Sequence, residues 1–590
     1  MMIEKPKDTG KTLGRLIRYI GSSRYLWVTL LVVVLFATLL NLAAPSIQGW
    51  AIDTIQFVDG QFQVDFAAMF RLLGLLAVSY LLYSALTYVQ GLFAAKLSQA
   101  TVRKLRQDLF DHIVHLPIAY TDTHAHGDLM SRMTNDVENI SNIISQSTAS
   151  LISGVLTIIG CLVIMLTYSP LLTLVSLVSI PLSIFTSGFI AKRTRRYFTQ
   201  QQRLLGSLNG HAEEMITGYK TIVAYTHEQQ AEAEFHAISG DLKKAGIKAQ
   251  IFGSVMGPMM NIIGNLTYLL IAATGGYLAL EGVITVGIIQ AFLIYSKQFS
   301  RPITEIANLY AQIQTAIAGA ERVFETMDSP VEIDEGRESL PPEQVRGDLR
   351  FDNLVFSYVP GEPVLKGLNL DVLRGQKIAI VGATGSGKTT IVNLLTRFYE
   401  LDGGRILLDG VDIRDIPKAQ LRRSIAIVLQ DTVLFSDTIA ANIRYGRLDA
   451  TDEQVRAAAH TANADLFIER LGLGYETPLS ESGGNLSQGQ RQLLSIARAV
   501  LADPKILILD EATSSVDTRT ELHIQQAMLA LMENRTSLII AHRLSTIRDA
   551  DLIIVIDDGA ICESGNHESL LAQKGRYYQL YQNQFAGIAT

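Results

Sequence analysis

The chain has 590 residues, more than one hydrophobic core usually holds, so we expect at least two domains. Hydrophobic residues make up 48% of it and the mean hydropathy is +0.23, which is high for a wholly soluble protein. The formal net charge of −7 provides no basic field for nucleic acid, and two widely separated cysteines argue against a disulfide framework.

Long uncharged stretches mark the N-terminal part of the chain. A basic segment ends at Arg24, and the stretch 25–52 that follows is too long for the core of a signal peptide. We therefore expect a retained membrane helix there. We predict further membrane helices over residues 67–95, 139–191, 249–280 and 283–296, of which 139–191 holds two, joined by a turn at 167–170. The total is six spans.

Loop charge predicts the orientation of these spans. The loop at 53–66 contains Asp but no Lys or Arg, whereas the segments 96–140 and 192–250 are rich in both. Since basic loops stay on the cytoplasmic side, we expect a multi-pass protein of the cytoplasmic (inner) membrane with both termini in the cytoplasm. The two basic segments are typical of helices that extend well into the cytoplasm.

A polar linker with Pro330, Pro341 and Pro342 separates this part from the rest of the chain. Beyond it, apolar runs of strand length alternate with helical patterns, which indicates an α/β domain with a largely parallel sheet. We divide the chain into a transmembrane domain at 1–325, a linker at 326–348 and an α/β domain at 349–585. The fold class is thus membrane α plus α/β.

The segment 382–389 reads G-A-T-G-S-G-K-T and fits the phosphate-binding pattern G-x-x-x-x-G-K-[ST]. It lies between a run of strand length and a stretch with helical periodicity, where glycines and a helix N-terminus can present N–H groups to phosphates. Lys388 is expected to reach the β- and γ-phosphates, and the Thr389 hydroxyl to ligate Mg²⁺. The ATP-binding residues assigned here are Gly382, Thr384, Gly385, Ser386, Gly387, Lys388, Thr389 and Thr390.

A second apolar run, 505–509, ends in the two carboxylates Asp510 and Glu511. On its own, such a run could be a buried strand that ends in a solvated acidic pair. Its place downstream of a phosphate-binding loop favours a catalytic interpretation. In P-loop ATPases the first carboxylate holds the Mg²⁺ shell and the second polarises the attacking water.

The sequence L-S-Q-G-Q at 486–490 precedes a helical stretch at 491–501. It resembles the L-S-G-G-Q signature of ATP-binding-cassette (ABC) proteins, although alone it could be a helix N-cap at Ser487. With the phosphate-binding loop and the Asp-Glu strand, it identifies the chain as a member of that family. Six spans ahead of one cassette resemble the exporter-type half-transporters, a six-helix membrane domain fused to a P-loop ATPase domain.

The resemblance implies roles for residues elsewhere in the cassette. Tyr358 would stack on adenine, and Gln430 would contact Mg²⁺ and water. His542 would contact the γ-phosphate and form the catalytic pair with Glu511, and Asp517 lies in the D-loop. Mg²⁺ would be held by Thr389, Gln430 and Asp510. The signature residues Ser487, Gln488, Gly489 and Gln490 would act in trans, on the ATP of a second subunit.

The resemblance extends to two cytoplasmic loops. The segments 127–132 and 135–137 match the first such loop of the family, and 213–214 with 218–222 match the second. These loops would carry short coupling helices that rest on the cassettes and transmit the motion of ATP binding to the membrane helices. The reaction is then ATP hydrolysis coupled to transport, with ATP and Mg²⁺ as cofactors.

The leading functional hypothesis is export of amphiphilic or hydrophobic compounds, of multidrug type, by alternating access. Nearly charge-free spans disfavour a small ion as the substrate. A lipid flippase of the same architecture is the alternative. An ATP-gated channel should show polar rings along a pore, and none is evident. Expected partners are a second half-transporter and membrane lipids, and not nucleic acid.

The signature departs from the family pattern at one position, where Gln488 replaces the first glycine. All the cis residues of the ATP site are present, so the pattern resembles the catalytically intact half of the bacterial heterodimeric multidrug exporters. The other interpretation is a homodimer that tolerates the substitution, because backbone N–H groups provide much of the surface that contacts the phosphates.

Overall fold

The computed structural model describes residues 8–58, 61–429, 432–480, 483–510, 518–541 and 547–585. They form two compact units. The first unit contains the chain up to Val114 together with His126–Ser329, and the second contains His115–Ala125 and the chain from Pro330 onward. The short segment 115–125 thus belongs to the second unit, although it lies between two helices of the first in the sequence.

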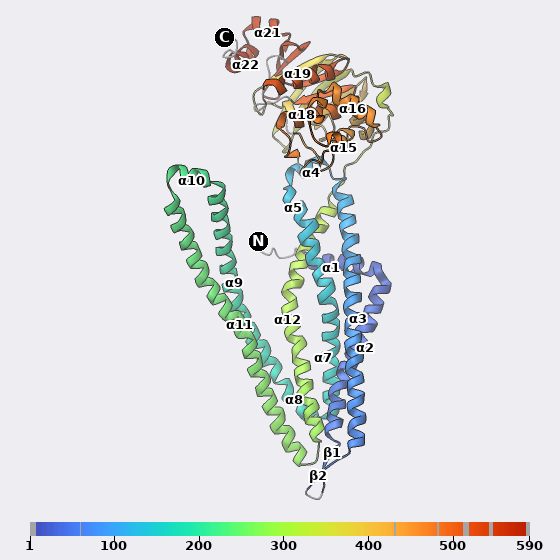
Figure 1. The fold of residues 1–590 in the computed structure, drawn as a ribbon, viewed down its shortest axis with the longest axis vertical. Helices are drawn as coiled ribbons and strands as arrows, with labels where there is room; N and C mark the ends of the chain where they lie inside the picture. The colour runs from blue at the N-terminus through green and yellow to red at the C-terminus, as the bar shows by residue number, and fades with distance from the viewer. Residues whose placement is uncertain are drawn as a thin grey trace. The chain divides into compact units, whose positions relative to one another are not determined.

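The first unit consists of long helices (Figure 1). Its α-helices are α1 (Thr9–Ile20), α2 (Arg24–Ile52), α3 (Phe66–Ile113), α5 (His126–Ser131), α6 (Val137–Asn142), α7 (Thr148–Tyr168), α8 (Pro170–Leu177), α9 (Ser179–Thr217), α10 (Tyr219–Tyr225), α11 (Glu228–Leu280) and α12 (Val286–Asp328). A 3₁₀ turn at Gly21–Ser23 (η1) and π-helical turns at Arg132–Asp136 (η2) and Ile143–Ser147 (η3) connect some of them. The helices α9 and α11 lie side by side and are joined by α10 (Figure 1).

Five stretches of helix among the described residues are long and apolar enough to cross a membrane, namely 24–52, 66–113, 126–168, 170–217 and 228–280. The predicted span at 283–296 lies on α12, which begins at Val286 and continues to Asp328 without a break. Composition alone does not mark α12 as a membrane span, because Lys297 and Arg301 follow its apolar first turns closely.

The first unit contains the five long apolar stretches and is called the membrane unit below. The predicted turn between the third and fourth spans is confirmed, since α7 ends at Tyr168 and Ser169 caps α8 by accepting a hydrogen bond from the Leu172 N–H. The loop after α2, however, contains an antiparallel hairpin of β1 (Ile55–Val58) and β2 (Gln61–Val64), which the sequence analysis did not predict.

The backbones of α2 and α12 meet at two glycines. A Cβ atom at Gly287 would lie 2.1 Å from the carbonyl oxygen of Gly49, so neither residue can carry a side chain there. Asp53 fixes the same contact, because its carboxylate accepts hydrogen bonds from the Thr285 hydroxyl (2.7 Å) and the Gly287 N–H (2.8 Å). The start of α12 is thereby tied to the end of α2.

Buried polar contacts fix the other end of α12. The Arg322 guanidinium binds the carboxylate of Asp136, which is 3% exposed, with Nε to Oδ2 at 2.9 Å. Arg132, also buried, donates from Nη1 to the Thr326 hydroxyl at 2.8 Å. Buried charges need such partners, and these contacts join α12 to the π-helical turn η2.

The amphipathic helix α1 packs on the same region. Arg15 donates two hydrogen bonds to Asp328, at 2.7 and 2.8 Å, and its guanidinium lies 4.3 Å from the ring centre of Phe324. The Tyr19 hydroxyl donates to Asp108 of α3 at 2.8 Å. The polar N-terminal segment is therefore held against the C-terminal end of α12 and against α3.

The second unit contains two sheets. The larger has six strands in the order β12-β11-β5-β10-β9-β8, all parallel except β12, and the smaller is antiparallel with the order β4-β3-β6-β7. The largely parallel sheet confirms the predicted fold class, while the antiparallel sheet was not predicted. The strands are β3 (Leu349–Ser357), β4 (Pro363–Val372), β5 (Lys377–Gly382), β6 (Gly403–Leu408), β7 (Val411–Asp412), β8 (Ile425–Val428), β9 (Ile506–Asp510), β10 (Thr536–Ile540), β11 (Leu552–Asp557) and β12 (Ala560–Gly565).

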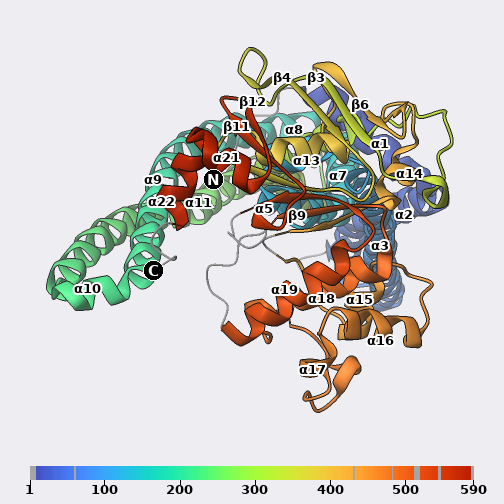
Figure 2. The ribbon, with the colours of Figure 1, turned by 90° about the horizontal axis from the view of Figure 1, so that it is seen from above.

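Helices cover the six-stranded sheet unevenly. Figure 2 shows α15, α16, α18 and α19 on one side of the second unit, and α13 with the antiparallel sheet on the other. The helical segments of this unit are α4 (Ile118–Thr123), η4 (Pro342–Gln344), α13 (Lys388–Leu395), α14 (Lys418–Arg423), α15 (Ile439–Arg444), α16 (Asp452–Thr461), α17 (Asp465–Ile468), η5 (Gly474–Glu476), α18 (Gln488–Ala502), α19 (Thr518–Met532), α21 (His567–Gln573) and α22 (Arg576–Phe585).

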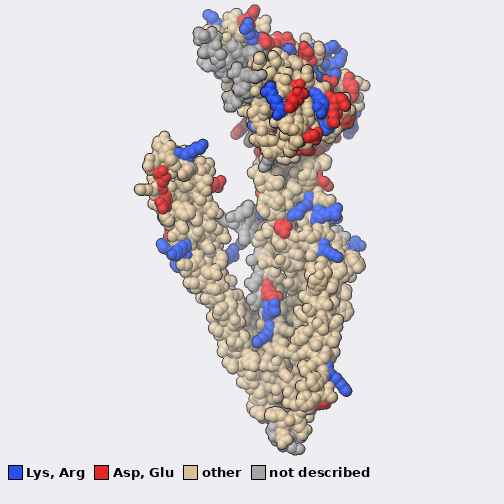
Figure 3. Space-filling model, in the orientation of Figure 1, with Lys and Arg blue, Asp and Glu red and all other residues tan. Residues whose placement is uncertain are grey.

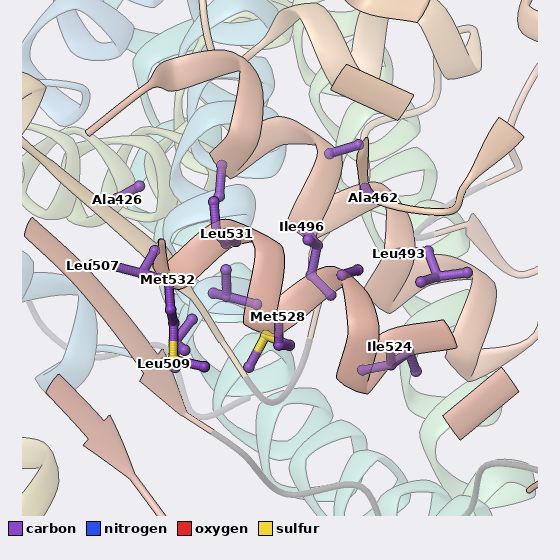
Figure 4. Packing of buried hydrophobic residues seen from close by; sticks show 14 of the residues in the cluster. Ala426, Ala462, Leu493, Ile496, Leu507, Leu509, Ile524, Met528, Leu531 and Met532 are labelled. Atoms are coloured by element: carbon purple, nitrogen blue, oxygen red, sulfur yellow. The ribbon is translucent and has the colours of Figure 1, made fainter. Parts of the chain in front are cut away.

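Alternate residues of the central strands enter two different cores. On β9, Leu507 and Leu509 pack with α18 and α19 in one cluster, which Figure 4 shows in close view. Ile506 and Ile508 point into a second cluster with α13 and the antiparallel sheet. Because both faces of these strands are buried, their apolar runs are continuous rather than alternating. The carboxyl ends of β5 and β9 are thereby held rigidly at one edge of the sheet.

The glycine contact between α2 and α12 yields a stability prediction. Gly287→Val should force the two backbones apart and lower the free energy of unfolding by about 1–3 kcal/mol, the usual effect of overpacking. The measurement is the thermal unfolding midpoint in detergent, compared with Gly276→Val. A Cβ at Gly276 on α11 meets no atom within 4 Å, so that variant should be nearly neutral. Equal midpoints for both variants would contradict the close contact.

Candidate nucleotide-binding site

The predicted phosphate-binding loop turns the chain from β5 into α13. Gly385 (φ +83°) and Gly387 (φ +101°) have left-handed backbone conformations, and α13 begins directly after Gly387. A Cβ atom at Gly387 would also lie 2.8 Å from Leu365 Cδ2. Gly387 is therefore required for both its conformation and the space that it leaves, and the loop leads directly into the positive end of a helix dipole.

Lys388 folds back over this loop. Its Nζ donates hydrogen bonds to the carbonyl oxygens of Gly382 (2.9 Å) and Ala383 (2.8 Å). Burial lowers the pKa of Lys388, and the negative charge of Asp510 opposes that shift. The amine thus lies over the loop within the electrostatic reach of Asp510. A bound phosphate would offer it an anionic acceptor in place of neutral carbonyls.

Two hydroxyls, Ser386 at the end of the loop and Thr389 at the start of α13, make no hydrogen bond with the residues that the structure describes. Ser386 Oγ is buried and has no hydrogen-bond partner among the described residues, and the Thr389 side chain is exposed. A buried hydroxyl without a partner is unusual, and a nucleotide phosphate would supply one. Mg²⁺ commonly takes one or two protein oxygens beside phosphate oxygens, so Thr389 and Asp510 fit a magnesium nucleotide.

The side chain of Tyr358, the predicted adenine platform, is held in place by hydrogen bonds at its hydroxyl and by aromatic contacts of its ring. Its hydroxyl donates to Thr390 Oγ1 (3.2 Å) and accepts a hydrogen bond from Asn393 Nδ2 (3.1 Å). The ring packs edge-on against Phe356 and Tyr399, with centroid distances of 4.8 and 5.0 Å. Since Tyr358 remains 44% exposed, the ring offers a surface for stacking beside α13.

The sequence analysis missed the residue that supports this aromatic group. The Tyr399 hydroxyl donates a 2.6 Å hydrogen bond to Asp122 on α4, and burial together with this bond raises the pKa of Tyr399. Helix α4 is thus tied to the ring cluster that includes Tyr358. The motifs at 127–132 and 135–137, which match the first cytoplasmic loop of the family, lie in the first unit, and the preceding segment 115–125 is the part grouped with the second. The sequence does contain a local indication of α4, because Pro117 is the N-cap of this short helix after the end of α3.

Five further residues were predicted at this site, and the structure describes one of them. Asp510 ends β9 and is half-buried at the edge where the phosphate-binding loop lies. Four others lie outside the described residues, and their assignments stay predictions. They are Gln430, Glu511, Asp517 and His542.

The signature segment forms the start of α18. Ser487 is its N-cap, and it exchanges hydrogen bonds with Gln490, from the Ser487 N–H to Oε1 (3.0 Å) and from the Gln490 N–H to Oγ (3.3 Å). Gln488 is the first helical residue and is half-buried, while Gly489 is buried. Among the described residues, no hydrogen bond joins this segment to the phosphate-binding loop of the same chain. The capping box uses the N–H groups of Ser487 and Gln490, and the positive end of the helix dipole remains at this segment.

Comparison with known proteins agrees with both units. Residues 27–303 match the family model of the ABC transporter transmembrane region, and residues 365–514 match the family model described as ABC transporter. The chain belongs to the ABC transporter family. It is therefore a membrane protein that binds nucleotide and couples ATP hydrolysis to transport. These matches confirm the family identified from the phosphate-binding loop, the Asp-Glu strand and the signature.

Three relatives show the extent of the similarity. The fatty acid ABC transporter ATP-binding/permease protein of Mycobacterium bovis is 44% identical over 88% of this chain and 82% of its own length. The ATP-dependent lipid A-core flippase of Syntrophus aciditrophicus is 38% identical over 86% of this chain and 84% of its own. A bacterial Atm1-family ABC exporter solved with ATP bound has a TM-score of 0.78 at 29% identity, covering 96% of this chain and 99% of that one. The exporter fold is therefore shared along nearly the whole length.

The ring geometry yields a binding prediction. Tyr358→Ala should weaken ATP binding by about 1–3 kcal/mol, the range for losing one base–aromatic stack. Tyr358→Phe is the matched control, because it keeps the ring and loses only the bonds to Thr390 and Asn393. Titration calorimetry with a non-hydrolysed ATP analogue measures both. If the phenylalanine variant loses as much affinity as the alanine variant, the hydroxyl rather than the ring carries the interaction.

Proposed function

We propose that this chain is one half of an exporter that uses ATP to move amphiphilic or hydrophobic compounds across a membrane by alternating access. One observation carries the proposal: a phosphate-binding loop and a unit of long, largely apolar helices occur in a single chain. ATP would favour the state in which two cassettes are closed, and hydrolysis would release it, so that ligand binding shifts the populations of two conformations.

The residues of the ATP site have distinct proposed tasks. Lys388 and the loop N–H groups would hold the β- and γ-phosphates, and Tyr358 would position adenine. Thr389, with Gln430 and Asp510, would hold Mg²⁺, which neutralises phosphate charge when bound. Glu511 would orient and polarise the attacking water, while His542 would contact the γ-phosphate. The D-loop residue Asp517 would lie at the boundary between the two cassettes.

The substrate proposal is supported by the kinds of relatives that the chain resembles. One is named a fatty acid transporter and another a lipid A-core flippase, and both names describe molecules with long apolar chains. Export of amphiphilic drugs and translocation of lipids are therefore the two candidates. Reconstitution into liposomes separates them, because ATP should drive movement of a fluorescent amphiphilic drug in the first case and of a labelled phospholipid in the second.

The proposed location is the cytoplasmic (inner) membrane, with the ATP-binding unit and both termini in the cytoplasm. Lys and Arg are concentrated in the segments 96–140 and 192–250, and the loop that contains the β1–β2 hairpin has none. This asymmetry follows the rule that basic loops remain inside.

We further propose that the working unit is a dimer. Helix α10 connects α9 and α11 and buries none of its residues, and two of its aromatic side chains, Tyr219 and Tyr225, are 64% and 73% exposed. An apolar helix left uncovered in this way suits contact with a second subunit. The signature segment, unpaired with its own phosphate-binding loop, also requires a second chain if it is to reach ATP.

The proposed partner is a different chain, which makes the exporter a heterodimer of multidrug type. Gln488 stands at the first helical position of α18, where the family has glycine, and a side chain there restricts how closely the backbone can approach a phosphate. The site formed with the partner's phosphate-binding loop would then hold ATP with little turnover. The site formed by Lys388 and Glu511 would be active, completed by an intact signature of the partner.

Co-expression tests this proposal. The chain is purified alone, with the half-transporter encoded beside it, and as Gln488→Gly, and ATPase activity and oligomeric state are measured in lipid. We expect the pair to be stable and active, with one turnover site, and the lone chain to be weakly active. A lone chain that forms a stable homodimer, hydrolyses ATP at both sites and transports substrate would overturn the heterodimer.

The role of Glu511 has a separate test. Glu511→Gln should retain ATP binding and lose about 10²–10⁴-fold in turnover, because the amide keeps the shape but cannot act as a base. Steady-state ATPase measurements and nucleotide affinity are compared with those of the wild-type protein. A variant that keeps more than about a tenth of wild-type turnover would exclude Glu511 as the main catalytic carboxylate, given that expected loss.

A further inference from the structure

A cavity of about 480 Å³ lies within the membrane unit, between α9, α11 and α12. This volume is in the range that small-molecule sites occupy. Apolar side chains form part of its wall, among them Met260, Ile263, Ile271 and Leu293. The space could therefore accept an apolar chain, but its other lining residues are unusually polar for a membrane helix bundle.

Three helices present polar residues to this cavity at helical spacing. α9 contributes Ser179 and Ser183, and α11 contributes Asn261 and Asn265, each pair one turn apart on one face. Amide and hydroxyl groups at such positions can hydrogen-bond a polar group of a ligand. Because polar side chains inside a membrane face protein or ligand rather than lipid, these pairs mark the polar end of a site.

α12 contributes the charged groups. Lys297, Arg301 and Glu305 follow one another at intervals of four residues and all line the cavity. Arg301 Nε donates to Glu305 Oε1 at 2.8 Å, so these two charges compensate each other. Lys297 is exposed and makes no hydrogen bond or ion pair with the described residues. The three charges sum to one uncompensated positive charge, carried by Lys297.

The depth of Lys297 makes that charge notable. It lies eleven residues after Val286, the first residue of α12, which corresponds to about 16 Å along the helix at 1.5 Å per residue. The hydrocarbon core of a bilayer is about 30 Å thick, so with Val286 at one boundary of that core, Lys297 would lie about halfway across. Figure 3 shows a small group of acidic and basic side chains on the otherwise uncharged surface between the α9–α11 pair and α12.

We propose that this cavity binds the head group of a single-chain amphiphile that carries a carboxylate or a phosphate, with Lys297 as its counter-charge. The Asn261 and Asn265 side chains would donate hydrogen bonds to the same head group, and the apolar wall would contact the chain. This inference rests on the proposed export of amphiphilic compounds and adds a preference for anionic ones. An ammonium is a point charge with three donors and suits either head group.

The test uses the full-length protein, with its partner if it needs one, in nanodiscs of neutral lipid. Stimulation of ATPase activity is titrated with four compounds of equal chain length: dodecanoate, dodecyl phosphate, dodecanol and dodecyltrimethylammonium. We expect both anions to act at lower concentration than the alcohol, and the cation to be weakest. Comparing the two anions shows whether carboxylate or phosphate is preferred.

Variants of Lys297 then separate ligand binding from structure. Lys297→Met should raise the half-stimulating concentration of the anions about tenfold or more, since hydrogen bonds to charged groups are among the strong ones, and leave dodecanol unchanged. Lys297→Arg should retain the anion preference, and Lys297→Glu should transfer it to dodecyltrimethylammonium. Lys243→Met, an exposed lysine on α11 away from the cavity, is the matched control. Thermal unfolding and basal ATPase activity check that each variant is folded.

The possible outcomes are distinguishable. If dodecanol and the anions stimulate equally and Lys297→Met changes nothing, the export proposal stands and the anionic preference is wrong. If Lys297→Met weakens every compound alike or only destabilises the dimer, Lys297 is structural and the inference also fails. If no amphiphile stimulates the folded, ATP-hydrolysing wild-type protein or is transported by it, the proposed function itself is wrong.

Discussion

The hydrogen bond between Asp122 and Tyr399 joins a segment that lies between helices of the membrane unit in the sequence to the unit that contains the phosphate-binding loop. It holds α4, a short helix that the chain inserts between two long membrane-unit helices, against the ATP-binding unit. Tyr399 in turn packs edge-on against Tyr358, whose hydroxyl is bonded to the first turns of α13. An adenine that stacks on Tyr358 would therefore press on a ring cluster already joined to the segment 115–125. Since that segment continues directly into α3 and α5, the nucleotide site and the membrane helices share a covalent and hydrogen-bonded path.

The rigidity of the ATP-binding unit makes this path effective. Both faces of β5 and β9 are buried, so neither strand end can shift without disturbing two cores at once. The loop after β5 and Asp510, the last residue of β9, are consequently fixed at one edge of the sheet. The charge of Asp510 opposes the lowering of the Lys388 pKa by burial, so the two side chains interact electrostatically. The buried Ser386 hydroxyl has no hydrogen-bond partner among the described residues, and a bound phosphate would provide one. Phosphate binding would then satisfy a hydroxyl that folding leaves without a hydrogen bond, in a loop whose backbone is already in place.

Much of this was predictable because short-range patterns determine it. The glycines at 385 and 387, the apolar residues 506–509 of β9 and the long apolar helices each depend on neighbours in the sequence. The features that were missed depend on distant contacts. The hairpin after α2, the antiparallel sheet and the Asp122–Tyr399 bond all join residues whose partners no local pattern names. Lys297 was placed beyond the end of the last span, because hydropathy falls there. The structure shows an uninterrupted helix, so the fall in hydropathy marks a polar wall and not the end of the helix.

α12 unites these observations in a single element. Near its start it is tied to α2 by Asp53, in its middle it carries Lys297 and the Arg301–Glu305 pair, and near its end it binds Asp136 through Arg322. Pro302 lies between Arg301 and Glu305, among the charged cavity residues, and a proline inside a helix removes one backbone hydrogen bond and permits a bend there. A change of angle at Pro302 would therefore move the part of α12 that carries Lys297 relative to the part that Arg322 joins to Asp136. The contact between Arg322 and Asp136 is costly to break, because separating it would leave a buried carboxylate unpaired, so the end of α12 and η2 stay joined when the helix bends.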